Sequence, residues 1–211
     1  MEPAAPATRA VGGALARWFE VTSVAPLSAF ALLHVASYGR VLFGMGELGA
    51  WESPSLALRV AEVLLVWAPL LLHVVLSPTV YGQRQLEPRV DASARASLTL
   101  HRLSGLVVGV FLVDHFVRFR LPILRGVRYP AEALGSLAAE LSRLTWGVPL
   151  VAGLHALGTL ALAFHMSFGL WRVAVRYPRV LRPETARWAC AGLGLVTAVV
   201  GTLTIIRLAT G

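Results

Sequence analysis

The stretch Leu162-Ala163-Phe164-His165-Met166 sets the pattern of this chain, because it is an apolar run with one histidine inside it. Three other apolar runs have the same form, and their histidines are His34, His73 and His115. An ionisable side chain within a membrane-spanning segment is costly, and such a residue is a candidate for a functional site. Four successive apolar segments therefore each contribute one candidate residue.

The composition indicates a membrane protein. Hydrophobic residues make up 56% of the 211 residues and charged residues only 14%, whereas soluble domains carry roughly 25% charged residues. The mean hydropathy is +0.69. A membrane-spanning helix needs ~20 apolar residues, and five segments come close to or exceed that length: 21–43, 56–81, 98–119, 148–175 and 188–208.

We therefore expect an all-α fold, an integral membrane bundle of five transmembrane helices. Residues 1–19 are predicted to form an N-terminal cytoplasmic tail, and residues 20–211 the five-helix domain. Residues 132–144 repeat apolar side chains near the helical period, which predicts a short amphipathic helix in the outer loop.

All nineteen cationic side chains are arginines, and they lie between the apolar segments rather than along one face. This distribution is typical of anchors at the membrane edge in contact with lipid, and it argues against nucleic-acid binding. Eleven arginines fall on the side of the N-terminus and eight on the other side. The positive-inside rule then places the N-terminus in the cytoplasm.

The depths of the four histidines sort them into two pairs. His34 and His115 lie six and three residues before the next arginine in the sequence, so both are about 5–10 Å from the outer edge at ~1.5 Å per residue. His73 and His165 lie eleven and seven residues before theirs, which places both in the inner half, about 10–16 Å from the inner edge. The alternative is that each histidine simply bonds a neighbouring helix.

Imidazole is a common axial ligand of haem iron, and helical bundles build such sites from facing helices. We therefore expect a membrane cytochrome b with two b haems, the outer one held by His34 and His115 and the inner one by His73 and His165. Cys190 is the only cysteine, which excludes the C-x-x-C-H attachment of a c-type haem and cysteine-ligated iron–sulfur clusters. Both haems would be held non-covalently.

The other candidate residues each have a structural alternative. Arg102, Ser104 and Ser167 could contact a haem propionate or a quinone, although a bond to its own backbone is favoured for each serine. Glu62 and Asp114 could relay protons from a quinol, although an interfacial charge is favoured for both.

Two further histidines lie near the proposed ligands in the sequence. His155 is ten residues before His165 and about 80° away around a helix, so we interpret it as an outer-half hydrogen-bonding or quinone-side residue. His101 is interpreted as a helix-start residue or a propionate contact.

These residues also resemble a known family, the five-helix dihaem cytochrome b subunits that anchor succinate dehydrogenases and fumarate reductases in the membrane. The resemblance covers about residues 19–206. It is carried by Trp67-Ala68-Pro69-Leu70-Leu71-Leu72-His73, by His101-Arg102-Leu103-Ser104-Gly105 continuing to Asp114-His115, and by Phe164-His165-Met166-Ser167-Phe168-Gly169-Leu170-Trp171.

The resemblance implies the same two histidine pairs as the depths do. It further implies a flavoprotein subunit with covalent FAD and an iron–sulfur subunit on the cytoplasmic side, and a quinone, typically menaquinone, as the electron partner. The expected location is the inner (cytoplasmic) membrane of a bacterium. Such a subunit needs no catalytic acid or nucleophile, because the cofactor carries the electron chemistry.

Two other functions remain open. One is a haem b subunit of a hydrogenase or a formate dehydrogenase. The other is a membrane transporter or scaffold that binds no haem.

Overall fold

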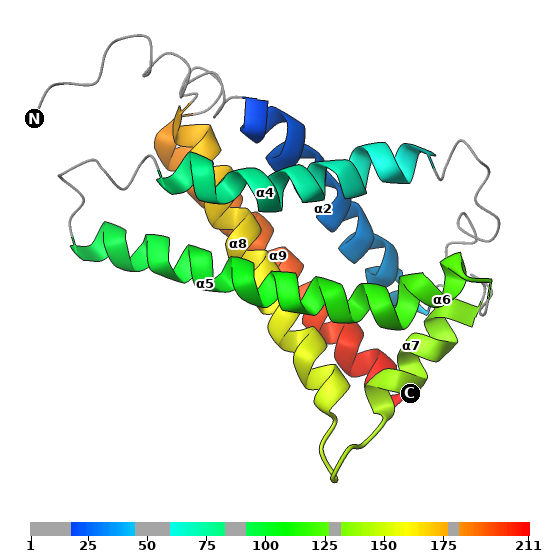
Figure 1. Ribbon diagram of the computed structural model, residues 1–211. Helices are drawn as coiled ribbons and strands as arrows, with labels where there is room; N and C mark the ends of the chain where they lie inside the picture. Colours follow the sequence, from blue (N-terminus) through cyan, green and yellow to red (C-terminus); the bar gives the residue numbers. More distant parts are fainter. Residues whose placement is uncertain (1–17, 45–59, 83–91, 127–131, 177–181) are drawn as a thin grey trace, which may run out of the picture. The chain divides into compact units, whose positions relative to one another are not determined.

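The computed structural model describes residues 18–44, 60–82, 92–126, 132–176 and 182–211. Almost all of these residues are helical, and no strand occurs among them. Within these described ranges, five helices are long and apolar enough to span a membrane: Ala25–Phe43, Val60–Ser77, Arg95–Leu124, Leu150–Val175 and Pro183–Thr210. The predicted fold class is confirmed, and the chain is an all-α, multi-pass membrane protein (Figure 1).

The chain divides into two compact units, Met1–Ala31 with Ser55–Arg95, and Leu32–Pro54 with Ala96–Gly211. The described part of the first unit contains the π-helical turn η1 (Glu20–Val24), the start of α2 (Ala25–Gly39), the π-helical turn η4 (Val63–Trp67) and α4 (Ala68–Gly82). η1 packs against α4. The predicted tail, residues 1–19, lies almost wholly outside the described residues.

The second unit contains the end of α2, the 3₁₀ turn η2 (Arg40–Phe43) and most of α5 (Ala92–His115). It continues with η6 (Phe116–Arg120), α6 (Leu121–Leu124), α7 (Ala133–Ser142), α8 (Leu150–Arg176) and α9 (Pro183–Thr210). The first segment ends at Gly44, which adopts the left-handed conformation at φ 67°. Glycine takes this conformation without the steric cost of a side chain.

The third segment is longer than predicted, because the helix runs without a break from Ala92 to Leu124 rather than over 98–119. Arginines can occupy helical positions beyond the apolar zone, since helical hydrogen bonding does not depend on hydropathy. The helix ends only where a residue favours another backbone conformation. That residue is Gly126, at φ 68°.

Small and hydroxyl-bearing residues hold α8 and α9 together. A Cβ added to Gly194 would collide with the side chain of Ser167, and one added to Gly201 would lie 2.5 Å from Thr159 Cγ2. Thr197 and Thr204 of α9 are also buried. Close approach through small residues is typical of membrane helices, where apolar side chains gain nothing by leaving the lipid.

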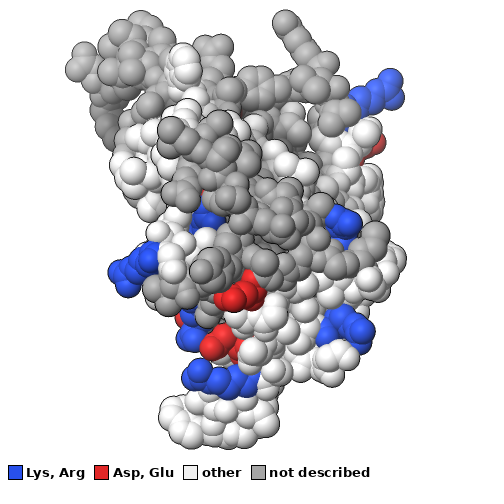
Figure 2. Space-filling view, turned by 90° about the vertical axis from the view of Figure 1, so that its right-hand side faces the viewer, with Lys and Arg blue, Asp and Glu red and all other residues white. Residues whose placement is uncertain are grey.

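Large apolar side chains on the opposite faces are exposed, as a lipid-facing surface requires. Leu195 and Leu203 of α9 and Leu160 of α8 are each about half exposed or more. On the face shown in Figure 2, uncharged surface separates small groups of arginine and acidic side chains.

The predicted amphipathic helix is confirmed as α7. Its apolar face packs on the protein, where Leu137 and Leu141 form a core cluster with Phe119 and Val151. Leu141 is completely buried. α7 contacts both α8 and α9, so it covers one end of this helix pair.

Candidate functional site

The rings of His34 and His115 lie close together in the second unit. His34 comes from α2 and His115 is the last residue of α5. Their ring centroids are 5.9 Å apart and the ring planes are almost perpendicular, at 87°. These are the two residues predicted as the outer pair.

His155 of α8 is the immediate neighbour of His115. Nε2 of His155 lies 3.3 Å from Nδ1 of His115, and Nδ1 of His155 lies 2.9 Å from the carbonyl oxygen of Val151. His155 is only 4% exposed. These contacts fit the hydrogen-bonding alternative predicted for His155, while its outer-half position and a quinone-side role stay predictions.

Aromatic rings enclose this group of histidines. Phe111 lies 5.5 Å from His115 and 5.2 Å from His155 between ring centroids. Phe119 lies 5.1 Å and 5.6 Å from the same two rings. Both phenylalanines are buried, so they keep water from the imidazoles on these sides.

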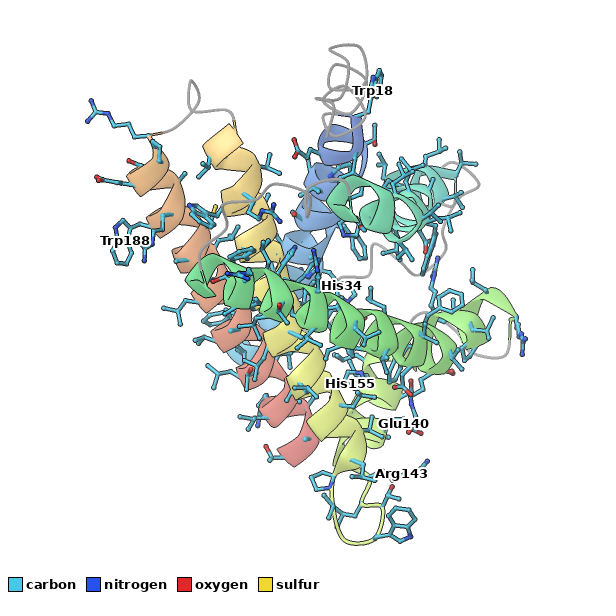
Figure 3. All side chains as sticks on the ribbon, turned by 60° about the vertical axis from the view of Figure 1, so that its left-hand side comes forward. Trp18, His34, Glu140, Arg143, His155 and Trp188 are labelled. Atoms are coloured by element: carbon cyan, nitrogen blue, oxygen red, sulfur yellow. The ribbon has the colours of Figure 1, made fainter. Side chains whose placement is uncertain are left out.

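A chain of ion pairs lies on the next turn of the helix. The guanidinium of Arg118 donates from Nε to both carboxylate oxygens of Asp114, at 2.8 and 2.9 Å. Arg118 Nη1 also donates to Glu140 of α7 at 3.4 Å, and Glu140 pairs with Arg143 at 3.6 Å (Figure 3). This ion pair is compatible with the favoured interpretation of Asp114 as an interfacial charge. That interpretation and a proton relay through Asp114 both stay predictions.

His165 of α8 lies against the middle of α5. Its ring stacks on that of His101, with centroids 4.1 Å apart and planes 11° from parallel. Nδ1 of His165 is 3.0 Å from the carbonyl oxygen of His101 and 3.3 Å from Ser104 Oγ. A carbonyl oxygen only accepts hydrogen bonds, so Nδ1 carries the proton and Nε2 keeps the lone pair that a metal would bind.

Gly105 makes this approach possible. A Cβ at Gly105 would stand 2.8 Å from Cε1 and 3.1 Å from Nδ1 of His165. One turn further on, a Cβ at Gly109 would meet nothing within 4 Å. Of these two glycines of α5, only Gly105 provides room for an imidazole ring.

His73 and Glu62 belong to the first unit. The ring of His73 stacks on buried Phe19, with centroids 5.1 Å apart. Trp67 Nε1 donates to Glu62 Oε1 at 3.0 Å. Because His165 lies in the second unit, the predicted inner pair of His73 with His165 stays a prediction, and so does a proton relay through Glu62.

The two candidate serines bond their own backbone, as favoured. Ser104 Oγ donates to the carbonyl oxygen of His101 at 2.8 Å, and Ser167 Oγ to that of Ala163 at 2.6 Å. Ser104 additionally contacts His165. Arg102 is exposed, and its contact with a propionate or quinone stays a prediction.

Sequence reasoning missed that His101 and His155 are the direct neighbours of two proposed ligands. The sequence contained a signal for these contacts, because α5 and α8 each carry two histidines. On α5, His101 and His115 are about 40° apart around the helix, so they share a face. If α5 and α8 run in opposite directions, the first histidine of each meets the second of the other.

Comparisons with protein-family models, with curated proteins and with solved structures found no match for this chain.

Proposed function

We propose that this chain is the membrane-anchor cytochrome b subunit of a succinate dehydrogenase or fumarate reductase. It would hold two b haems and pass electrons between an iron–sulfur subunit and a quinone, typically menaquinone. The observation that supports this most directly is the meeting of the His34 and His115 rings, 5.9 Å apart, from helices far apart in the sequence.

The geometry of this pair fits a shared metal. Imidazole nitrogens bind metals at about 2 Å, so two rings that share one ion must lie close together. The centroids of His34 and His115 are 5.9 Å apart.

The residues present also suit the chemistry of a haem. Histidine nitrogens from two helices would hold the iron of each haem, a ligand type that suits electron transfer. When bound, the haems would supply the one-electron chemistry. Phe111 and Phe119 exclude water from the outer histidines, and the hydrogen bond from Nδ1 of His165 holds its ring with Nε2 available as a ligand.

The surroundings of such a subunit follow from the resemblance. A flavoprotein subunit with FAD and an iron–sulfur subunit would dock on the cytoplasmic side, with the N-terminus also cytoplasmic. The membrane would be the inner membrane of a bacterium. Two haems at two depths would then connect the faces of the bilayer electrically.

A reduced-minus-oxidised absorbance spectrum of the purified complex tests the proposal. We expect a b-type α band of two haems, and His34→Ala and His115→Ala should each remove the outer haem. Leu33→Ala is the matched control, because Leu33 is 69% exposed on the same helix and should leave both haems in place. Absence of a b-type band, or retention of both haems in both histidine variants, would contradict the proposal.

The electron donor distinguishes this function from its alternative among redox proteins. Succinate should reduce the haems through the subunits that co-purify with the chain. Reduction by hydrogen or formate instead would indicate the haem b subunit of a hydrogenase or a formate dehydrogenase.

A further inference from the structure

His155 is a buried polar residue to which the proposed function gives no task. It lies in the middle of a hydrogen-bonded chain, between Nδ1 of His115 on α5 and the carbonyl oxygen of Val151 on its own helix. We propose that His155 is a positioning residue, which fixes the tautomer and orientation of His115 for ligation of the outer haem iron. This inference rests on the proposed function.

The directions of the two hydrogen bonds follow from the Val151 carbonyl at one end of the chain. The carbonyl oxygen of Val151 can only accept, so Nδ1 of His155 must carry a proton. A buried ring, 4% exposed, favours its neutral form, and Nε2 of His155 is then an acceptor. Nδ1 of His115 must therefore donate to it, which leaves the lone pair of His115 on Nε2.

This arrangement is the usual support of a metal-binding histidine. Such a histidine generally donates its second ring N–H to an acceptor, which fixes the tautomer, orients the ring and raises the basicity of the ligating nitrogen. In this chain, His165 uses a backbone carbonyl, that of His101, for the same purpose. His115 instead has a side-chain acceptor, so its support can be removed by mutation.

Packing holds His155 in place for this role. Phe111 and Phe119 contact the rings of both His115 and His155. A Cβ added to Gly158 would collide with the ring of Phe111, so the missing side chain at Gly158 allows Phe111 to reach this position. The hydrogen-bonded pair is enclosed on the sides where water would otherwise compete.

The experiment uses the full chain purified with its co-purifying subunits, and compares His155→Leu with His155→Gln. Leucine fills a similar volume without an acceptor, whereas the amide oxygen of glutamine can replace Nε2. For His155→Leu we expect a more positive midpoint potential and changed electron paramagnetic resonance g-values of the outer haem, or a 10–100-fold weaker retention of it. The inner haem should not change.

His155→Gln should restore the potential and the g-values toward those of the unmodified protein. Leu157→Ala is the control for a change in α8 alone, because Leu157 is 55% exposed. If His155→Leu does not fold, His155→Ala also removes the acceptor, and the same changes in the potential and g-values of the outer haem are expected.

The outcomes separate the two proposals. An outer haem with unchanged potential and g-values in a variant that lacks the acceptor would overturn the role of His155 and leave the proposed function standing. A change in the outer haem of His155→Leu that His155→Gln fails to reverse would also overturn this role, because it would indicate that His155 contributes packing alone. Absence of any b-type haem from the unmodified complex would instead refute the proposed function.

Discussion

Replacing Gly105 with alanine tests the contact between α5 and α8 directly. The added Cβ would stand 2.8 Å from Cε1 of His165, which is ~0.6 Å or more inside an ordinary carbon–carbon contact. The ring cannot easily retreat, because it stacks on His101 at 4.1 Å and its Nδ1 is held by the carbonyl oxygen of His101. Either this hydrogen bond breaks or the two helices separate.

The magnitude follows from two alternative costs and one opposing gain. Overpacking a close contact costs about 1–3 kcal/mol, and loss of the hydrogen bond would cost about 0.5–1.5 kcal/mol. Alanine in a helix interior is more favourable than glycine by about 1 kcal/mol. This gain is the same at Gly109, where a Cβ meets nothing within 4 Å, so Gly109→Ala is the matched control on the same helix.

We therefore expect Gly105→Ala to be less stable than Gly109→Ala by about 1–3 kcal/mol. Unfolding of each variant by sodium dodecyl sulfate in mild detergent micelles, followed by circular dichroism, measures the free energies of unfolding. Equal stability of the two alanine variants, to within about 0.5 kcal/mol, would refute the contact between Gly105 and His165.

Three other predictions concern stability and use the same measurement. Leu141→Ala should destabilise the protein by about 2–5 kcal/mol, because Leu141 is completely buried. The control Leu144→Ala, at a residue 63% exposed, should change stability by less than about 0.5 kcal/mol. Similar effects of the two variants would argue against the packing of α7. Asp114→Asn should cost no more than about 1 kcal/mol, because its partner Arg118 is 37% exposed; a much larger loss would show that the pair is buried in the assembled protein. Thr197→Val should cost no more than about 1.5 kcal/mol, the usual net value of one hydrogen bond, because among the described residues the hydroxyl donates to the Leu193 carbonyl of its own helix. A larger loss would indicate a partner on another helix.

The sequence by itself determined the elements of this protein. Five apolar segments and the amphipathic helix α7 were all predicted at close to their observed positions. The reason is that hydropathy and helical period are local properties, which a window of about 20 residues contains in full. The bonds of Ser104 and Ser167 to their own backbone are equally local.

Only the tertiary structure decided which side chains meet. Depth along each helix predicted that His34 and His115 share a level, and their rings lie 5.9 Å apart, but depth carries no information on rotation about the helix axis. The contacts of His155 with His115 and of His101 with His165 depend on how α5 and α8 face each other. The difference between Gly105 and Gly109 has the same origin, since identical residues one helical turn apart differ only in what the neighbouring helix places opposite them.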